Sequence, residues 1–281
     1  MNRFDWLKER RTGIGGSDVP GVLGISPYST PYTVWADKIG LLPEKEYTEA
    51  MRQGTDLEAY VTRRFCEETG LKAHGKNQII RNPNYPYALA NIDRRIVGER
   101  AGLEVKTCSP FRLPDFEGDD YPPEYLAQCL HYLGVTDWDR WYLAVLILGT
   151  EFRVYKIERT DYISEIEDIQ KQVNDFWTTY VIPKVSPPVD GTAATGAAIA
   201  NIYNTAVDRS VELPELEQAF VEIAVLSEQQ KELEQEKERH KQSIKLAMGE
   251  NTRAECSCYV ASWKPRKDGV RVFQIKEKRG A

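Results

Sequence analysis

The chain has 281 residues and a formal net charge of −6 at pH 7; 41% of its residues are hydrophobic and 28% are charged. This composition indicates an ordinary soluble protein, long enough for one large core or a core with a small appendage. The sequence has no apolar run of the roughly 18 residues that a membrane helix needs and no signal-peptide segment at its start. We therefore expect neither a membrane protein nor a secreted one.

The five cysteines show no disulfide framework. Cys256 and Cys258 are too close for a usual zinc knuckle, and no third and fourth ligands stand near them. We predict free thiols in a reducing cytoplasm.

The first distinctive segment is 10–19, which reads RRTGIGGSDV. Three glycines in four positions allow the backbone to approach a ligand closely. A helix start, the hydroxyl of Ser17 and an upstream arginine, Arg10 or Arg11, are typical of a phosphate cradle. The segment does not match the nucleotide-binding P-loop pattern, and no Rossmann strand precedes it.

Residues 55–69 are predicted to form a helix, because Leu57, Val61 and Phe65 belong to one apolar stripe. Glu58 flanks this stripe, where its carboxylate could reach into a cleft. The alternative is a solvated glutamate on a helix surface.

Two strands are predicted at 87–93 and 103–107, separated by a turn-rich gap. Residues two apart in a strand share a face, so Glu104 and Lys106 project together, and Asp93 joins them if the strands are neighbours. Carboxylate oxygens suit Mg²⁺ or Mn²⁺, and such a site serves phosphodiester hydrolysis. The alternative is an exposed strand with alternating charges.

A helix is predicted over 121–135, where Leu126, Leu130 and other apolar residues repeat at helical spacing. Gln128 and Tyr132 are four residues apart and share a face of this helix. A glutamine amide can contact both a metal-bound water and a phosphate. The alternative is a surface glutamine beside a half-buried tyrosine.

The rest of the first 182 residues completes an α/β core. Residues 140–148 and 151–158 are predicted to form a hairpin, and 162–180 show helical spacing. We predict a mixed central sheet flanked by helices, as a domain over 1–182.

Residues 183–212 are rich in Pro, Gly, Ala and Thr and are predicted to be a linker or a long surface crossing. An accessory region, 213–281, follows. Within it, 214–248 is predicted to be a long helix, either an arm or a helical hairpin, and 259–275 a small β-hairpin.

The tail from 252 to 281 reverses the acidic balance of the chain. The run Trp263 to Lys267 joins an aromatic residue to basic ones, as single-strand binders do. The alternative is a hairpin tip with solvated charges. Local sign matters more than net charge for a groove that binds DNA, so the net charge of −6 argues only mildly against a nucleic-acid ligand.

Taken in order, these segments resemble a known family. The motifs are Arg-x-x-x-Ile-Gly-Gly-Ser-Asp, Ser26-Pro27-Tyr28, Trp35 with Lys38, Gly54-x-x-x-Glu58, Asp93, Glu104-x-Lys106 and Gln128-x-x-x-Tyr132. Over roughly residues 3–180 they resemble the YqaJ-type viral recombinases, relatives of the phage lambda exonuclease within the PD-(D/E)xK nuclease superfamily. Ile92 stands where the superfamily name has proline. The resemblance implies a restriction-endonuclease-like α/β core.

The resemblance also implies a metal site. Asp93 and Glu104 would be ligands of Mg²⁺ or Mn²⁺, together with the carbonyl of Val105. Lys106 would orient or activate the attacking water. Glu58 would be an outer ligand, or a base acting through a water on a second metal.

The remaining roles concern the DNA. Gln128, on the helix face that it shares with Tyr132, would hold the nucleophile or the scissile phosphate. Ser17 with Arg10 would grip the 5′-terminal phosphate, and Arg11 is the alternative if the register shifts by one.

The function implied is a 5′→3′ exonuclease acting on linear double-stranded DNA. It would leave 3′ single strands for a partner annealing protein and act as a homo-oligomeric ring, a trimer by resemblance, in the bacterial host of a phage or prophage. Two alternatives stay open: an end-independent endonuclease on the same core, and a non-catalytic DNA recombination scaffold.

Overall fold

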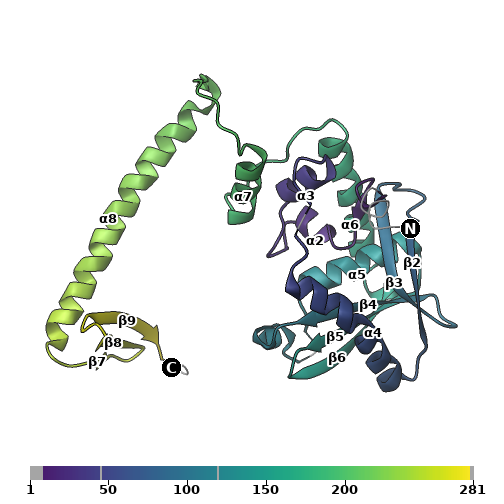
Figure 1. Ribbon diagram of the computed structural model, residues 1–281, viewed down its shortest axis with the longest axis horizontal. Coiled ribbons are helices and arrows are strands. Elements are labelled where there is room, and N and C mark those ends of the chain that lie inside the picture. Colours follow the sequence, from purple (N-terminus) through teal and green to yellow (C-terminus); the bar gives the residue numbers. More distant parts are fainter. Residues whose placement is uncertain (1–8, 45, 119, 279–281) are drawn as a thin grey trace. The chain divides into compact units, whose positions relative to one another are not determined.

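The structure, a computed structural model, describes residues 9–44, 46–118 and 120–278. The chain forms two compact units, Met1–Ala206 and Val207–Ala281. Figure 1 labels their helices and strands along the chain.

The first unit is built on a mixed β-sheet. In the described part of the chain this sheet has six strands, in the order β1-β3-β4-β5-β6 with β2 also paired to β3. The strands are β1 (Ile14–Gly15), β2 (Ala73–Arg81), β3 (Ala88–Ile96), β4 (Ala101–Cys108), β5 (Arg140–Ile147) and β6 (Glu151–Glu158). The pairs β1–β3 and β4–β5 are parallel and the other pairs are antiparallel.

One face of the sheet is covered by α4 (Glu49–Thr69). Val61 and Phe65 of this helix are buried against strand residues that include Leu103 and Tyr142. The helix begins earlier than the predicted residue 55, because Thr48 caps it by accepting a hydrogen bond from the amide of Met51. Its first turns are exposed and so show no apolar spacing in the sequence.

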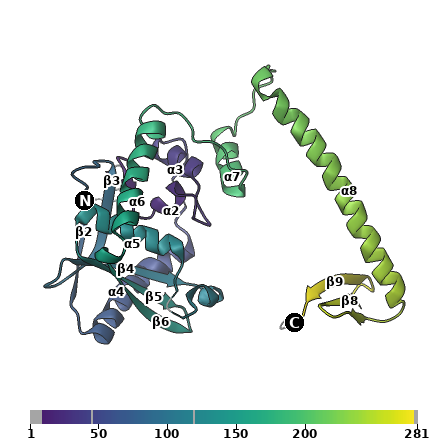
Figure 2. The same ribbon diagram turned by 180° about the vertical axis from the view of Figure 1, so that it is seen from behind.

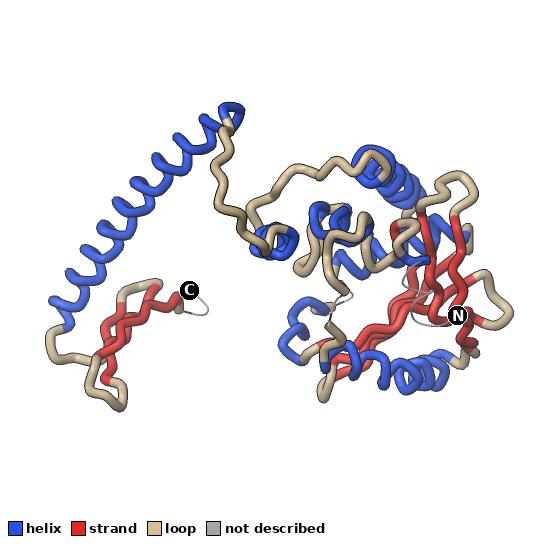
Figure 3. The backbone as a smooth tube through the Cα atoms, turned by 45° about the horizontal axis from the view of Figure 1, so that its top comes forward, coloured by secondary structure: helices blue, strands red, loops and turns tan. Residues whose placement is uncertain are grey.

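The opposite face carries the larger core. Alternate residues of β5, including Trp141 and Leu143, pack there against helices that contribute Leu133 and Val173. The helices in this layer are α2 (Val19–Val22), α3 (Pro31–Lys38), α5 (Pro123–Thr136) and α6 (Ile163–Phe176), which continues as a π-helical turn, η3 (Trp177–Val181). Figures 2 and 3 show helices on both sides of the strands. The predicted mixed sheet flanked by helices is confirmed.

Shorter elements connect these layers. Two 3₁₀ turns, η1 (Pro110–Phe116) and η2 (Arg159–Asp161), follow β4 and β6. The segment 183–212, predicted as a linker, contains the helix α7 (Ala193–Ile202). Thr195 of α7 is buried and its hydroxyl lies 2.8 Å from that of Thr30 at the start of α3, so part of this segment packs on the first unit.

The second unit pairs one long helix with a small sheet. A 3₁₀ turn, η4 (Pro214–Leu216), leads into α8 (Glu217–Met248), which is continuous, so the helical-hairpin alternative for 214–248 is wrong. The antiparallel sheet contains β7 (Arg253–Glu255), β8 (Tyr259–Pro265) and β9 (Arg271–Glu277). The predicted hairpin is therefore β8–β9, extended by β7.

Over the described residues, none of the helices is both long and apolar enough to cross a membrane.

Candidate active site

Strand pairing leaves an opening along one edge of β3. On the edge opposite β2, β1 pairs with β3 only at Ala88 and Leu89, and β4 pairs with it only at Arg94 and Arg95. Residues 90–93 between these two stretches have no recorded strand partner on that edge. Asp93 on β3 and Glu104 on β4 are the first residues beyond the short stretch in which these two strands pair with each other. The two predicted carboxylates therefore meet where the strands separate.

A closed set of polar contacts joins β4 to α5 beside this opening. The ammonium of Lys106 lies 2.6 Å from a carboxylate oxygen of Glu104 and donates to the amide oxygen of Gln128 at 2.8 Å. The amide nitrogen of Gln128 donates to the same carboxylate at 2.8 Å and to the hydroxyl oxygen of Tyr132 at 2.9 Å. Glu104, Gln128 and Tyr132 are buried. Gln128 thus fixes the carboxylate and the ammonium relative to each other.

Asp93 experiences a strongly negative environment. Burial, the carboxylate of Glu104 and that of Glu58 together raise the pKa of Asp93 to about 7. Burial alone would lower the pKa of Lys106, but its ion pair with Glu104 raises that pKa. Lys106 therefore stays charged and pairs with Glu104, while Arg94 pairs with Glu58, so these two cations do not neutralise Asp93 as well. A further cation would be stabilised here.

The glycine-rich loop forms the opposite wall. A guanidinium nitrogen of Arg10 donates to the hydroxyl of Ser17 at 2.9 Å and to Asp18 at 3.2 Å. Asp18 also accepts from the backbone amide of Gly15 at 3.0 Å and from buried Lys38 at 2.6 Å. These partners hold the pKa of Asp18 well below its usual range despite burial. The loop is thus fixed by a buried charge network.

A single cavity connects the two walls. It has a volume of about 210 Å³ and is lined from the loop by Arg10 and Ser17 and from the sheet and α5 by Asp93, Glu104, Lys106, Gln128 and Tyr132. Gly16 also lines it, and a Cβ atom there would lie 2.5 Å from the ring of Tyr132. The loop can approach α5 this closely only because residue 16 has no side chain.

The donor atoms around the cavity fit a hard divalent cation. Asp93 and Glu104 supply carboxylate oxygens, and Asn91, two residues before Asp93, also lines the cavity. The side-chain oxygen of Asn91 is buried and has no hydrogen-bond partner among the described residues. Among all residues that the structure describes, no cluster of three or more His, Cys, Asp or Glu side chains is suited to a metal. A cation here would thus combine two carboxylates with neutral oxygens, which suits Mg²⁺ or Mn²⁺.

Two other predicted site residues are held elsewhere. Glu58 on α4 forms a 2.7 Å ion pair with Arg94 and is not among the residues that line the cavity, although its charge affects Asp93. Arg11 faces Asp37, 3.6 Å away, so Arg10 is the arginine of the pair that reaches the cavity. Val105 lies between Glu104 and Lys106 in β4 and pairs with Ala144 of β5.

The contribution of Asn91 and two ion pairs that shape the site, Asp18–Lys38 and Glu58–Arg94, were not predicted from the sequence. Asn91 could have been found, because it shares a strand face with Asp93. Asp18 and Lys38 are 20 residues apart, and Glu58 and Arg94 are further apart still. No local pattern indicates either pair.

Comparison with known proteins places the chain in a family. Residues 5–139 match the YqaJ-like viral recombinase domain. The YqaJ protein of Bacillus subtilis strain 168 is 37% identical over 273 residues, which cover 94% of this chain and 84% of that protein. The chain belongs to the YqaJ-like viral recombinase family. The resemblance seen in the ordered motifs is therefore confirmed.

The fold of this YqaJ-like chain has a solved counterpart. The crystal structure of an alkaline exonuclease, LHK-Exo from Laribacter hongkongensis, superposes with a TM-score of 0.54 at 19% identity, covering 65% of this chain and 94% of that one. The structure of the same enzyme in complex with dAMP gives the same values. The α/β core of this YqaJ-like protein thus has the fold of that exonuclease.

Proposed function

We propose that this protein is a divalent-metal-dependent exonuclease that degrades the 5′-ended strand of linear double-stranded DNA and leaves 3′ single-stranded overhangs for recombination. One observation carries the proposal: a cavity lined on one side by Asp93, Glu104 and Lys106 is lined on the other by Arg10 and Ser17. Carboxylates for a cation and donors for a phosphate thus share one small space. Membership of a viral recombinase family and the fold shared with an alkaline exonuclease support it.

The metal site would use oxygen ligands from two strands. Asp93, Glu104, the carbonyl of Val105 and the side-chain oxygen of Asn91 would hold Mg²⁺ or Mn²⁺. The bound ion would lower the pKa of a water and neutralise charge on the phosphate. Asp93 must lose its proton to serve as a ligand, and its pKa of about 7 in the metal-free site means that protons compete with the cation increasingly as the pH falls below neutral. Glu58 would contribute only after release from Arg94.

The other residues would position the reacting groups. Lys106, held by Glu104 and Gln128, would place its ammonium beside the attacking water or the scissile phosphate and stabilise developing negative charge. Gln128 would maintain that position, because its amide nitrogen is itself held by a hydrogen bond to the hydroxyl of Tyr132. Because these contacts already exist in the structure, little reorganisation would be needed during the reaction.

The 5′-terminal phosphate would bind at the loop. Arg10 and Ser17 lie in contact with each other at the rim of the cavity, and an arginine beside a hydroxyl gives charge-assisted hydrogen bonds to a phosphate. Such a grip matters only to an enzyme that starts at an end. It therefore favours an exonuclease over an end-independent endonuclease.

Three further parts of the proposal concern assembly and setting. The protein would act as a ring-shaped homo-oligomer, a trimer, around its DNA. It would deliver the 3′ strand to a single-strand annealing protein. It would work in the cytoplasm of a bacterial host, encoded by a phage or prophage.

The test compares ends with closed circles. Purified protein with Mg²⁺ is incubated with linear duplex DNA carrying a 5′-phosphate, the same duplex without it, and a covalently closed circle. We expect mononucleotides from phosphorylated 5′ ends and an intact circle. Cutting of the circle would show an endonuclease, and no cutting with Mg²⁺ or Mn²⁺ would support a non-catalytic scaffold.

The same assay tests the loop with a matched pair of variants. Arg10→Gln should remove most of the preference for a 5′-phosphate, by about 10-fold or more, because a charge-assisted contact is lost. Arg11→Gln, which removes the same charge from the neighbouring position, should leave the preference unchanged. Equal effects of both variants would reject the role of Arg10.

A further inference from the structure

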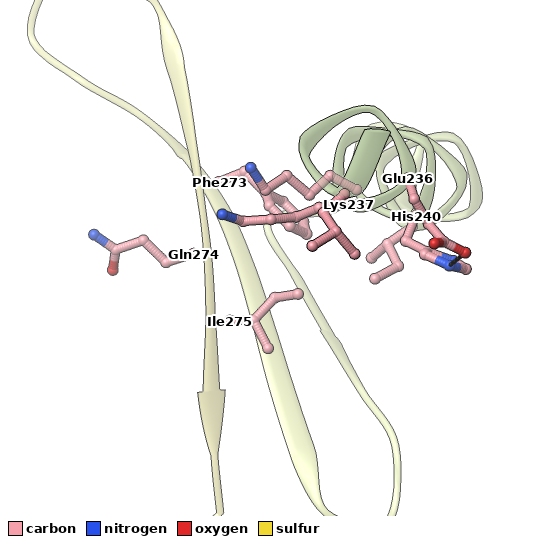
Figure 4. A pocket seen from close by; sticks show the side chains of 9 residues that line it. Glu236, Lys237, His240, Phe273, Gln274 and Ile275 are labelled. Atoms are coloured by element: carbon pink, nitrogen blue, oxygen red, sulfur yellow. Dashed lines mark ion pairs between the residues drawn. The ribbon is translucent and has the colours of Figure 1, made fainter. Parts of the chain in front are cut away.

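The small sheet of the second unit has two unlike faces. Phe273 and Ile275 of β9 lie on the side of α8, whereas Gln274 points away from the helix (Figure 4). Because side chains alternate along a strand, residues paired across the sheet with Gln274 share its face. The register pairs Gln274 with Ser262 and Ser262 with Arg253. Arg253, Ser262 and Gln274 therefore belong to the outer face, the one turned away from α8.

This outer face is basic. Lys264 and Lys276 lie two residues from Ser262 and Gln274 along their strands and share their face; both are exposed, as is Arg253. Glu255, which pairs with Val260, is the acidic residue at this face. It lies 3.0 Å from the ammonium of Lys278 and 3.8 Å from Arg253.

The positive charges here differ from those on the helix. Each Lys or Arg of α8 forms an ion pair with a glutamate of the same helix, namely Lys231, Lys237, Arg239, Lys241 and Lys245. In the described part of the tail, by contrast, Lys264, Arg266, Lys267 and Lys276 form no ion pair with a carboxylate. Four unneutralised cations on one short sheet and its hairpin tip mark a surface suited to a polyanion.

The aromatic residue of the basic run is not available on this face. Trp263 lies on the side of Phe273, and the guanidinium of Arg271 stacks 3.7 Å from the centre of its ring. Arg271 is in turn held by the backbone carbonyls of Gly249 and Asn251. Single-stranded DNA is usually bound by stacking of its bases on exposed aromatic rings, and the outer-face positions of β7, β8 and β9 carry none. The sequence-based hypothesis of a single-strand binder built on Trp263 is therefore disfavoured.

We propose that the outer face of β7–β8–β9 is a second DNA-binding surface, which contacts the phosphate backbone of double-stranded DNA. Duplex DNA offers a high density of phosphates and needs no stacking platform. Arg253, Lys264 and Lys276 supply the charge, while Ser262 and Gln274 supply neutral donors between them. The contact is independent of base sequence and of the hydrolytic site, so it extends the proposed function without resting on it.

The experiment measures binding of the full chain to a fluorescent duplex by anisotropy, in EDTA so that no hydrolysis occurs, over a range of salt concentrations. The triple variant Arg253→Gln, Lys264→Gln, Lys276→Gln should bind on the order of 10-fold more weakly at moderate salt. The slope of log Kd against log salt should fall by roughly 2 to 3, because each phosphate contact contributes about 0.9.

The matched control carries Lys231→Gln, Lys237→Gln and Lys241→Gln, which removes the same charge from α8. It should leave the affinity and the slope unchanged. A variant of opposite effect, Glu255→Gln, should tighten binding because it releases Lys278 and Arg253. Thermal unfolding verifies that each variant is folded; the changed side chains are exposed except Lys241, which is half-buried, so loss of folding is not expected.

Four results would overturn the proposal. The triple variant of the sheet could bind the duplex as tightly as the wild type, or both triple variants could weaken binding equally. Glu255→Gln could weaken binding, or the triple variant of the sheet could lose affinity only for a single-stranded DNA measured in the same way. Hydrolysis of a short duplex is measured separately on the same variants. Absence of hydrolysis in every protein, including the wild type, would reject the proposed nuclease while leaving the binding result intact.

Discussion

Asp93 and Lys106 show how two neighbouring charged residues acquire different properties. Lys106 has a carboxylate and an amide oxygen as partners and stays protonated. Asp93 is buried near Glu104 and Glu58, so its pKa rises to about 7. In the absence of a metal, the site therefore takes up a proton as the pH falls below about 7, where a cation would otherwise be bound.

This makes the stability of the metal-free protein depend on pH. The pKa of Asp93 in the folded protein lies above the ordinary value of 3.8. The contribution of this group to the free energy of unfolding is therefore fully present below pH 3.8 and is lost as the pH rises through about 7. Asp93→Asn mimics the protonated form. In EDTA it should melt higher than the wild type at pH 8, by roughly 5 °C, with a smaller difference at pH 5.

Added Mg²⁺ should reduce this difference in Tm. At pH 8 it should raise the Tm of the wild type but not that of Asp93→Asn, which lacks the charged ligand. Asp175→Asn, an exposed change on α6, serves as the control and should behave like the wild type. Equal Tm values for wild type and Asp93→Asn in EDTA at both pH values would contradict the account of Asp93.

A local period predicts only part of the convergence at this site: Asp93 joins Glu104 and Lys106 only because β3 and β4 are neighbours, and Gln128 was expected there from the family resemblance. Alternation in a strand places Glu104 with Lys106. The position of Glu58 could not be predicted in this way. Its partner Arg94 lies on β3, and their contact depends on how α4 packs across the sheet.

At the scale of elements, the separation of β1 and β4 along β3 creates the cavity. The sequence predicted β3 and β4 as strands, and their pairing is confirmed. It did not predict that β1, only two residues long, occupies the same edge of β3. The spacing of residues along the sequence does not indicate which distant segments pair as strands. The loop could therefore be expected to bind phosphate, but its position beside β3 could not be predicted.

Two glycines test this packing in opposite directions. At Gly16 a Cβ atom would lie 2.5 Å from the ring of buried Tyr132, so Gly16→Ala should destabilise the fold by about 1–3 kcal/mol and reduce hydrolysis. Gly54 lies within α4, where the nearest atom would be 3.6 Å away, so Gly54→Ala should stabilise by about 0.5–1 kcal/mol. Denaturant unfolding measures both. An unchanged free energy of unfolding for Gly16→Ala would mean that the loop does not pack on α5 as described.

The same reasoning applies to α8. Its apolar residues and its charges are both regularly spaced, so the sequence predicted a helix but left open whether it turned back on itself. The structure shows a single helix of 32 residues, about 48 Å long. β7 was missed because three residues, Arg253–Glu255, are too few to show an alternating pattern.

For the whole molecule, the proposed ring predicts a mass. Light scattering after size exclusion should give about three times the chain mass of 32.1 kDa. A ring closed by cyclic symmetry keeps a duplex threaded without tight binding at any one contact. The measurement is repeated at high salt as a control for DNA carried through purification. A mass of one chain at every concentration would contradict the ring.

The most direct test of the central claim is the rate at which Glu104→Gln releases mononucleotides from a 5′-phosphorylated linear duplex in Mg²⁺. Glutamine retains the shape of the side chain but removes the charge that would hold a cation. Glu151→Gln, an exposed change on β6 of the same sheet, is the matched control. We predict a loss of at least about 100-fold for Glu104→Gln and none for the control. Wild-type activity in a folded Glu104→Gln protein would contradict the assignment of the active site.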